Sequence, residues 1–214
     1  MSNFGFLHLR VVNPYEVAFR EARSAVGASA LLASAEEFHS VSDAVADCTL
    51  VVGTTAVRHR ELQQPLRHLA DGAPVIRKQL KSSRVALVFG SEKVGLSNRD
   101  LSHCDWVMNI PTRAEHASMN LGQAVAVCLY ELAPSRTEHR QSELVDSRAT
   151  AGTLDRITCT LLDALCASGY VHSGTEASTE DKVRRLLRRL NLNSRDAEIW
   201  LGMLKQILWK LRQQ

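Results

Sequence analysis

Short apolar runs separated by helix-like segments fill the first two thirds of the chain. Three of these runs are continuous, at residues 49–52 (TLVV), 85–89 (VALVF) and 106–110 (WVMNI), and each is followed or ended by glycine or proline. Continuous runs of this length are typical of strands buried on both faces of a parallel sheet. An earlier strand is expected over residues 7–12 (LHLRVV), where an Asn-Pro pair then stops it.

Helical periodicity appears between the predicted strands. Residues 16–26 carry alanines at helical spacing, and Ser42 is expected to cap a short helix that runs through Val45. Residues 120–132 are rich in alanine, valine and leucine and predict a longer helix. Because strands alternate with helices, the pattern predicts an α/β fold with a parallel sheet.

The last third of the chain has a different pattern, which predicts helices and no strands. One helix is expected around Ile157, Leu161 and Leu165, and two more over residues 181–190 and 197–211. A stretch with proline, serine, threonine and mixed charges separates these helices from the preceding part. The expected organisation is an α/β domain over residues 1–132, a linker over 133–150 and a small C-terminal helical extension over 151–214.

Composition narrows the class of protein. Of 214 residues, 45% are hydrophobic and 23% are charged, which excludes a chain that is disordered throughout. No apolar run reaches the ~20 residues that a membrane helix needs, and the N-terminus lacks the pattern of a signal peptide. The five cysteines form no C-x-x-C pair, so neither a disulfide scaffold nor a zinc ribbon is expected. We expect a cytoplasmic protein with no membrane partner and no metal.

Positive charge is concentrated in the last third of the chain. The formal net charge is +3; residues 1–150 hold 16 basic and 16 acidic side chains, whereas residues 151–214 hold 10 and 7. One helix there has an apolar face formed by Val183, Leu186, Leu187 and Leu190. Its cations predict an RNA-binding surface, the alternative being a solvated helix whose charges only confer solubility. The predicted RNA-binding residues are Lys182, Arg184, Arg185, Arg188 and Arg189.

Glycine and small polar residues follow the three predicted buried strands. They form the segments 53–56 (GTTA), 89–96 (FGSEKVGL) and 117–121 (ASMNL), the last of which follows Ile110-Pro111. Open parallel sheets bind ligands beyond the carboxyl ends of their strands, and glycine lets a backbone approach a ligand closely. We therefore expect these three segments to share one binding site, with Ser118 capping the helix that follows.

The same segments carry a family resemblance. The runs ALVFGSEKVGLSN, NIP and ASMNLGQAVAVCLYE resemble the SpoU/TrmH class of the SPOUT RNA methyltransferases, and LRVVNPY with VVGTTA resembles its TrmJ branch. The resemblance covers roughly residues 1–132 and, more loosely, the helical tail. It implies a trefoil-knotted α/β domain, a homodimer and S-adenosylmethionine as the methyl donor. It also implies 2′-O-methylation of a cytidine or uridine ribose in the anticodon loop of tRNA.

The resemblance also assigns site residues. Glu92 matches a glutamate for which we expect an orienting role, and Asn120 matches an asparagine thought to position the target ribose. Ser118 belongs to both the catalytic and the cofactor-binding positions, and Met119 stands where leucine is commoner. The cofactor-binding positions are Thr54, Thr55, Ala56, Gly90, Leu96, Ile110, Ala117, Ser118, Met119 and Leu121.

One departure from the family pattern concerns the N-terminus. In the family, a motif arginine proposed as the base for the 2′-hydroxyl lies just before a segment like the one at which this chain starts. By the resemblance, that arginine, the first strand and most of the first helix would precede residue 1. We expect either that the true start lies upstream or that this is a truncated form. Without the arginine, a non-catalytic RNA-binding dimer is an alternative, and a ribosomal RNA 2′-O-methyltransferase of the same class is a separate one.

Overall fold

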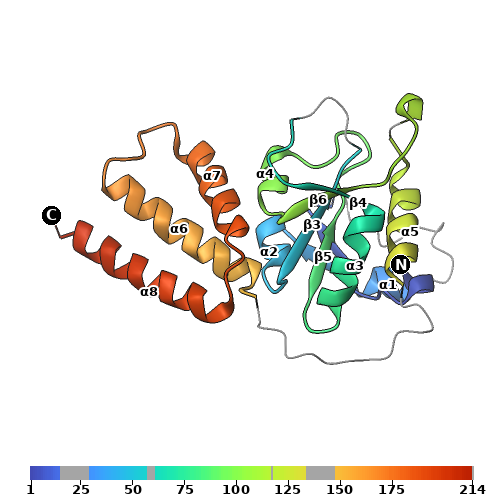
Figure 1. The fold of residues 1–214 in the computed structure, drawn as a ribbon, viewed down its shortest axis with the longest axis horizontal. Helices are drawn as coiled ribbons and strands as arrows, with labels where there is room; N and C mark the ends of the chain where they lie inside the picture. Colours follow the sequence, from blue (N-terminus) through green and yellow to red (C-terminus); the bar gives the residue numbers. More distant parts are fainter. Residues whose placement is uncertain (15–28, 57–60, 117, 134–147, 214) are drawn as a thin grey trace.

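A computed structural model describes residues 1–14, 29–56, 61–116, 118–133 and 148–213 of the chain. An α/β part and a part made of three helices lie side by side (Figure 1). In the described residues the strands are β1 (Arg10–Val12), β2 (Glu36–Phe38), β3 (Leu50–Thr54), β4 (Leu66–His68), β5 (Val85–Val88) and β6 (Trp106–Asn109). The α-helices are α1 (Ser29–Ala33), α2 (Val41–Val45), α3 (Leu69–Leu80), α4 (Asn98–Ser102), α5 (Leu121–Leu132), α6 (Ala151–Ala167), α7 (Glu176–Arg189) and α8 (Ser194–Leu211).

The main sheet is parallel, as the sequence predicts. Its strand order is β4-β6-β3-β5, so β3 lies between β5 and β6, and the chain crosses over β3 between those two strands. In β3, Leu50 and Val52 contribute to one core cluster and Val51 to another, because successive side chains of a strand point to opposite faces. Both faces are covered, which explains the continuous apolar runs. The α/β prediction is confirmed, and the trefoil knot stays a prediction.

The core is made of three clusters, of which the second joins the two parts. The first lies between one face of the sheet and helices α3 and α5, and it includes Ile76, Trp106 and Leu132. The second lies on the opposite face, and it includes Ala151 at the start of α6. The third fills the space among α6, α7 and α8 around Ile157. Because α6 contributes to two clusters, the helical part is packed directly onto the sheet.

The caps of two helices and the presence of a third differ from the predictions. Helix α2 begins after Ser40, whose hydroxyl oxygen accepts a hydrogen bond from the Asp43 N–H, so the prediction that Ser42 caps it is wrong. Helix α5 is capped by Asn120 and not by Ser118. Helix α3 was not predicted, because it contains Gly72 and Pro74. Gly72 lies so close to Trp106 that an added Cβ would stand 2.7 Å from the ring.

Other sequence predictions fall on residues without a description. The predicted helix over residues 16–26 and most of the predicted linker over 133–150 lie outside the described part of the chain. The boundaries at 132/133 and 150/151 therefore stay predictions. At the start of the helical part, Thr150 caps α6, and the N–H groups of Ala151 and Gly152 donate to the carbonyls of Cys48 and Ala46.

Candidate active site

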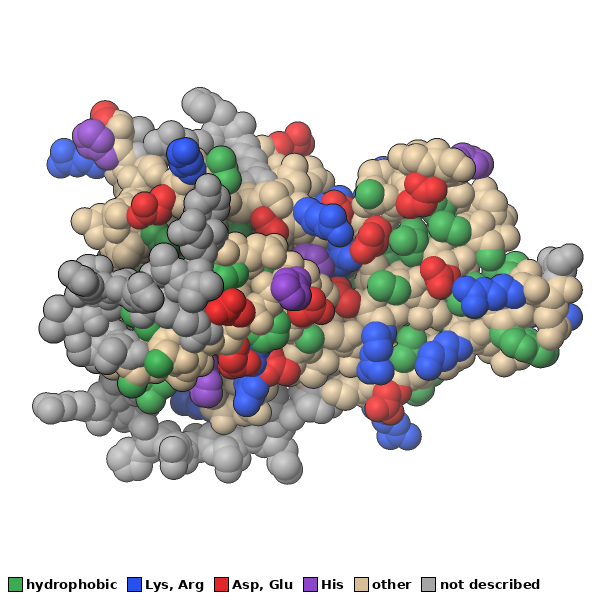
Figure 2. All heavy atoms as spheres, turned by 180° about the vertical axis from the view of Figure 1, so that it is seen from behind, with side chains coloured by type: hydrophobic (Ala, Val, Ile, Leu, Met, Phe, Trp, Pro, Cys, Tyr) green, Lys and Arg blue, Asp and Glu red, His purple; other side chains and the backbone are tan. Residues whose placement is uncertain are grey.

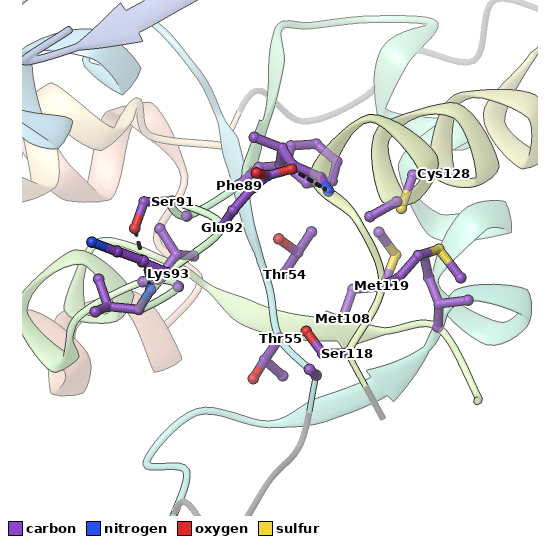
Figure 3. Close-up of a pocket in the computed structure, with 18 of the residues that line it drawn as sticks. Thr54, Thr55, Phe89, Ser91, Glu92, Lys93, Met108, Ser118, Met119 and Cys128 are labelled. Atoms are coloured by element: carbon purple, nitrogen blue, oxygen red, sulfur yellow. Dashed lines mark hydrogen bonds between the residues drawn. The ribbon is translucent and has the colours of Figure 1, made fainter. Parts of the chain in front are cut away.

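A cavity of about 300 Å³ lies at the carboxyl ends of the neighbouring strands β6, β3 and β5. Figure 3 labels a lining residue from each strand end: Thr54 of β3, Met108 of β6 and Phe89, which directly follows β5. The strand order makes this convergence necessary, because β3 has β5 and β6 as its two neighbours and parallel strands end at one edge. The three segments that the sequence groups together therefore line one cavity, and their role as a binding site stays a prediction.

Most of the predicted cofactor-binding residues line this cavity. Ala117 lies outside the described residues. The predicted residues that do line it are Thr54, Thr55, Ala56, Gly90, Leu96, Ile110, Ser118, Met119 and Leu121.

The loop after β5 folds back on itself and forms one wall of the cavity. Gly95 has a φ of +69°, and its N–H donates to the Ser91 carbonyl over 2.9 Å. The returning chain passes so close to Gly90 that a Cβ there would stand 2.1 Å from the Gly95 carbonyl carbon and 2.3 Å from the Leu96 nitrogen. Both contacts are with backbone atoms, which cannot rotate away. Residue 90 must therefore be glycine for the loop to keep this shape.

Glu92 connects this loop to the start of α5. Its Oε1 accepts a hydrogen bond from Asn120 Nδ2 over 2.8 Å and another from the Leu121 N–H over 3.3 Å (Figure 3 shows the second). A carboxylate at a helix N-terminus is favoured by the unpaired N–H groups and the helix dipole. The orienting role of Glu92 stays a prediction, and the Asn120 side chain is a group that its carboxylate contacts.

Asn120 is fixed at both ends of its side-chain amide. While Nδ2 donates to Glu92, Oδ1 accepts from the Gln123 N–H over 3.3 Å and so caps α5. The two contacts determine which way the amide points, since exchanging its nitrogen and oxygen would lose both hydrogen bonds. Asn120 is exposed and stands between two residues that line the cavity, Met119 and Leu121. Because the Asn120 amide is already held in one orientation, it can contact a substrate hydroxyl at the cavity without losing further side-chain freedom.

Sequence reasoning missed several residues of the cavity wall. Met108 of β6 and Cys128 of α5 are buried and also belong to the first core cluster. Burial raises the pKa of the Cys128 thiol to about 11, so it is protonated at neutral pH. Met119 and Cys128 place their sulfur atoms on one side of the cavity (Figure 3). The sequence pattern gave no sign that Cys128, a core position on a predicted helix, would also face a cavity. The other missed residues are Thr112 and Ala124, whereas Phe89, Ser91, Lys93, Val94 and Gly95 belong to the predicted segment 89–96.

The predicted RNA-binding helix is rotated from its expected orientation. Arg184 and Arg188 are buried, with exposed fractions of 5% and 3%, whereas Leu186 and Leu190 of the expected apolar face are exposed. The prediction that these two arginines face RNA is therefore wrong. Lys182 and Arg189 are exposed and Arg185 is half-buried. On the face drawn in Figure 2, basic and acidic side chains are mixed over the helical part.

The two buried arginines are held by carboxylates from other elements. Asp155 of α6 lies 3.2 Å from Arg184 Nε, 3.9 Å from Arg188 Nη2 and 3.6 Å from the His103 ring, and it also accepts a hydrogen bond from the Ser42 hydroxyl over 2.6 Å. Arg184 Nη1 donates to the Ser102 hydroxyl over 3.2 Å. A buried cation requires such partners, because leaving it unpaired would cost several kcal/mol.

Titration of the carboxylates in this cluster follows from these contacts. Burial alone would raise the pKa of Asp155, but the His103 and Ser42 side chains and the Arg188 charge outweigh it and hold the pKa below its usual range. Burial raises the pKa of Asp105, which faces Arg188 from the other side, and Arg188 and the Val51 N–H only partly offset this. Asp155 is therefore the firmly ionised carboxylate that joins the sheet part to the helical part.

Two further findings concern the described residues only. Within them, no group of three or more His, Cys, Asp or Glu side chains has the arrangement of a metal site, and the expectation of no metal stays a prediction. No helix in the same residues is both long enough and apolar enough to cross a membrane.

Known proteins match this chain over nearly its whole length. Residues 1–130 match the sequence pattern of the SpoU rRNA Methylase family. The tRNA (cytidine/uridine-2′-O-)-methyltransferase TrmJ of Sodalis glossinidius is 30% identical over 212 residues, which cover 97% of this chain and 83% of that protein. The protein of the same name from Citrobacter koseri is 32% identical, with 97% and 87% covered.

Solved structures show the same relationship. The crystal structure of TrmJ from Z. mobilis ZM4 is similar to this chain with a TM-score of 0.84 and 28% identity, covering 97% of this chain and 89% of that one. A probable methylase family protein from Haemophilus influenzae Rd KW20 has a TM-score of 0.58 and 26% identity, covering 99% and 88%.

Proposed function

Because this chain belongs to the SpoU methylase family, we propose that it transfers a methyl group from S-adenosylmethionine to a ribose 2′-hydroxyl of tRNA. The observation that carries the proposal is the convergence of three loops from adjacent parallel strands on one cavity. Relatives that are about 30% identical to this chain over nearly its whole length are named as tRNA methyltransferases that act on cytidine and uridine. This supports tRNA as the substrate.

The cavity suits S-adenosylmethionine in size and chemistry. Its volume of about 300 Å³ lies at the lower end of the range for small-molecule sites. Leu96, Ile110 and Leu121 offer apolar contact to a flat base, while Thr55 and Ser118 offer hydroxyl groups to the polar end. The tight turn at Gly90 brings backbone atoms to the cavity wall, because a side chain at residue 90 would collide with the backbone of Gly95 and Leu96.

The chemistry in this site depends on positioning. S-adenosylmethionine supplies an electrophilic methyl group when bound, so the chain has to place an oxygen nucleophile in line with it. Alignment of two reactants can lower a barrier by about 7–11 kcal/mol in the best cases. We assign this task to Asn120, whose amide is fixed by Glu92 and by the Gln123 N–H. Glu92 acts through Asn120 and the Leu121 N–H and is a positioning residue.

Two further parts of the proposal concern partners. Lys182, Arg185 and Arg189 remain as the cations of α7 that can reach RNA phosphates, since Arg184 and Arg188 are buried.

We also propose a homodimer. Exposed apolar side chains of α5, Val127 and Tyr130, support a second copy at that face. Sedimentation of the purified chain tests this, and a monomer at micromolar concentration would contradict it.

Cofactor binding and methyl transfer are tested together. The purified chain is titrated with S-adenosylmethionine in a calorimeter and then incubated with methyl-labelled cofactor and either tRNA or ribosomal RNA. We expect binding and an alkali-resistant label in tRNA. No cofactor binding would refute the proposal. Label in ribosomal RNA alone would favour the ribosomal alternative, and binding of cofactor and RNA without transfer would favour a non-catalytic RNA-binding protein.

A further inference from the structure

The last helix of the chain carries an uncovered apolar stripe. Ile199, Met203 and Ile207 of α8 are 53%, 51% and 51% exposed, and they follow one another at intervals of four residues. Residues four apart are neighbours on one face of a helix. Ala197 and Leu204, on a different face, belong to the third core cluster. Helix α8 therefore has two apolar faces, and the chain covers only the one that holds Ala197 and Leu204.

Helix α8 lies at one side of the helical part. Figure 1 shows α6 between α7 and α8, and α6 packs against both of them. The outer face of a helix in such a place is normally polar. Gly202 adjoins the stripe, and a Cβ added there would have no atom within 4 Å. Because the distance between packed helices depends on the side chains at the contact, a glycine beside apolar residues suits a close helix–helix contact.

The residues around the stripe are arranged symmetrically about Met203. Ile199 and Ile207 lie four residues before and after it, and Asp196 and Lys210 lie seven before and after it. At 3.6 residues per turn, all four side chains point within about 40° of the direction of Met203. A twofold axis beside Met203 places a second α8 antiparallel to the first. Ile199 then shares a layer with Ile207 of the second copy, and Asp196 meets its Lys210, each twice.

The two charges at the ends of the stripe are available for such a contact. Asp196 and Lys210 are exposed, and within the part of the chain that the structure describes neither forms an ion pair. The Asp196 carboxylate accepts a hydrogen bond from the Asn193 amide over 3.0 Å, but this donor is neutral and leaves the charge uncompensated. An antiparallel second copy supplies the opposite charge at both ends.

Other occupants fit this face less well. RNA phosphates would be repelled by Asp196 and would gain nothing from Ile199, Met203 and Ile207. Helices that lie on a lipid surface have cations along the polar border of their apolar face, whereas this stripe has an acid at one end. A second copy of α8 uses both the apolar side chains and the two opposite charges.

We infer that α8 packs antiparallel against α8 of a second copy of this chain, around Met203. The inference goes beyond the proposed homodimer, which takes α5 as its face, and it does not depend on methyl transfer. Contact over the roughly 21 Å between Asp196 and Lys210, on a helix about 10 Å wide, covers about 200 Å² of each copy in projection. A standard interface buries about 800 Å² per partner. The α8 contact therefore depends on protein concentration.

Two twofold faces on one chain have a further consequence. When both α5 and α8 pair with other copies, the assembly closes as a tetramer or grows as an open chain of copies. When α5 stays unpaired, the α8 contact alone gives a dimer. In either case α8 adds one association step, and removing its contact removes that step and no other.

The test exchanges charges on α8 of the full-length chain. Lys210→Glu places like charges opposite each other twice, and Asp196→Lys combined with Lys210→Glu restores opposite charges in reversed positions. Lys205→Glu is the matched control, because Lys205 is an exposed cation of the same helix, two residues after Met203 and so on another face. Sedimentation velocity measures association up to about 200 µM protein. Thermal unfolding checks that each variant is folded.

We expect Lys210→Glu to weaken one association step roughly tenfold, because two attractive contacts become repulsive, and the double variant to restore it. Lys205→Glu should associate like the wild type. Equal association of the wild type and Lys210→Glu, or a double variant that is not restored, would overturn the inference.

The residual state of Lys210→Glu separates this contact from the proposed homodimer. A variant that loses the step but remains a dimer supports both the α8 contact and the α5 face. A variant that becomes a monomer supports the α8 contact and refutes α5 as the dimer face. A wild-type chain that stays monomeric up to about 200 µM would overturn the α8 contact and the homodimer together, and methyl transfer would be tested separately.

Discussion

Replacing Asp155 by alanine should loosen the attachment of the helical part to the sheet. Asp155 is 8% exposed and contacts side chains from α2, from the segment after α4 and from α7. Its removal leaves Arg184 and Arg188 buried with fewer partners, and it also removes the acceptor of the Ser42 hydroxyl. The side chain is thus shared by both parts of the chain.

The expected size of the effect follows from the remaining partners. Breaking a buried ion pair by removing one member costs about 3–5 kcal/mol. Arg184 keeps Glu180 and Asp181 on its own helix, which points to the lower end, near 3 kcal/mol. For a chain of this size, each kcal/mol lowers Tm by about 2–4 °C, so a fall of roughly 6–12 °C is expected.

Asp163→Ala is the matched control for this variant. Asp163 also lies on α6 and pairs with Arg212 over 3.4 Å, but the two side chains are 57% and 65% exposed. An exposed pair contributes about 0–1 kcal/mol. Thermal unfolding followed by circular dichroism compares the two variants. If Asp155→Ala and Asp163→Ala lower Tm equally, the buried cluster does not stabilise the junction and the reasoning is refuted.

Three further predictions concern the site and its pH dependence. Asn120→Ala should lower methyl-transfer turnover with little change in cofactor affinity. Loss of the helix cap alone costs ~1 kcal/mol of stability, so Asn120→Ser, which retains a capping hydroxyl, serves as the control that separates the catalytic effect from the capping effect. A wild-type rate in the alanine variant would remove Asn120 from the site. Gly90→Ala should abolish S-adenosylmethionine binding in calorimetry, because the added Cβ would stand 2.1 Å from the Gly95 carbonyl carbon. Gly202 has open space around it, so Gly202→Ala should leave binding unchanged. Equal affinities of the two variants would contradict the role of the turn at Gly90. The folded-state pKa of Asp155 lies below its unfolded value near 3.9, so its contribution to the free energy of unfolding is fully present above pH ~4 and is lost as pH falls toward the folded pKa. In chemical denaturation, the difference in unfolding free energy between wild type and Asp155→Asn should therefore shrink below pH 4. A constant difference down to pH 2 would argue against this role of Asp155.

Elements buried on both faces were predictable from the sequence. The runs that became β3, β5 and β6 are continuous because helices cover both sides of the sheet. Strand β4 was missed, since its three residues are exposed and show no apolar pattern. Its pairing with β6 depends on backbone hydrogen bonds, which leave no trace in the choice of side chains.

Long-range contacts explain the errors in the helical part. The orientation of α7 was expected from its leucines, but Arg184 and Arg188 turn inward because Asp155 and Asp105, far away in sequence, offer them charge partners. Ser42 similarly contacts Asp155 instead of capping a helix. In the candidate site, the loops were predictable from glycine and small polar residues. Met108 and Cys128 were not, because a residue that fills the core and lines a cavity has an ordinary apolar pattern.

The cavity walls include segments that are distant along the chain, at residues 54–56, 89–96, 110–112 and 118–121. During synthesis on the ribosome, no such hollow can exist until the last of these segments has emerged and β6 has paired with β3. A small molecule that binds there therefore stabilises only the finished sheet, by an amount set by its concentration relative to its dissociation constant. The protein's resistance to heat and proteolysis in a cell should then rise and fall with the supply of that molecule.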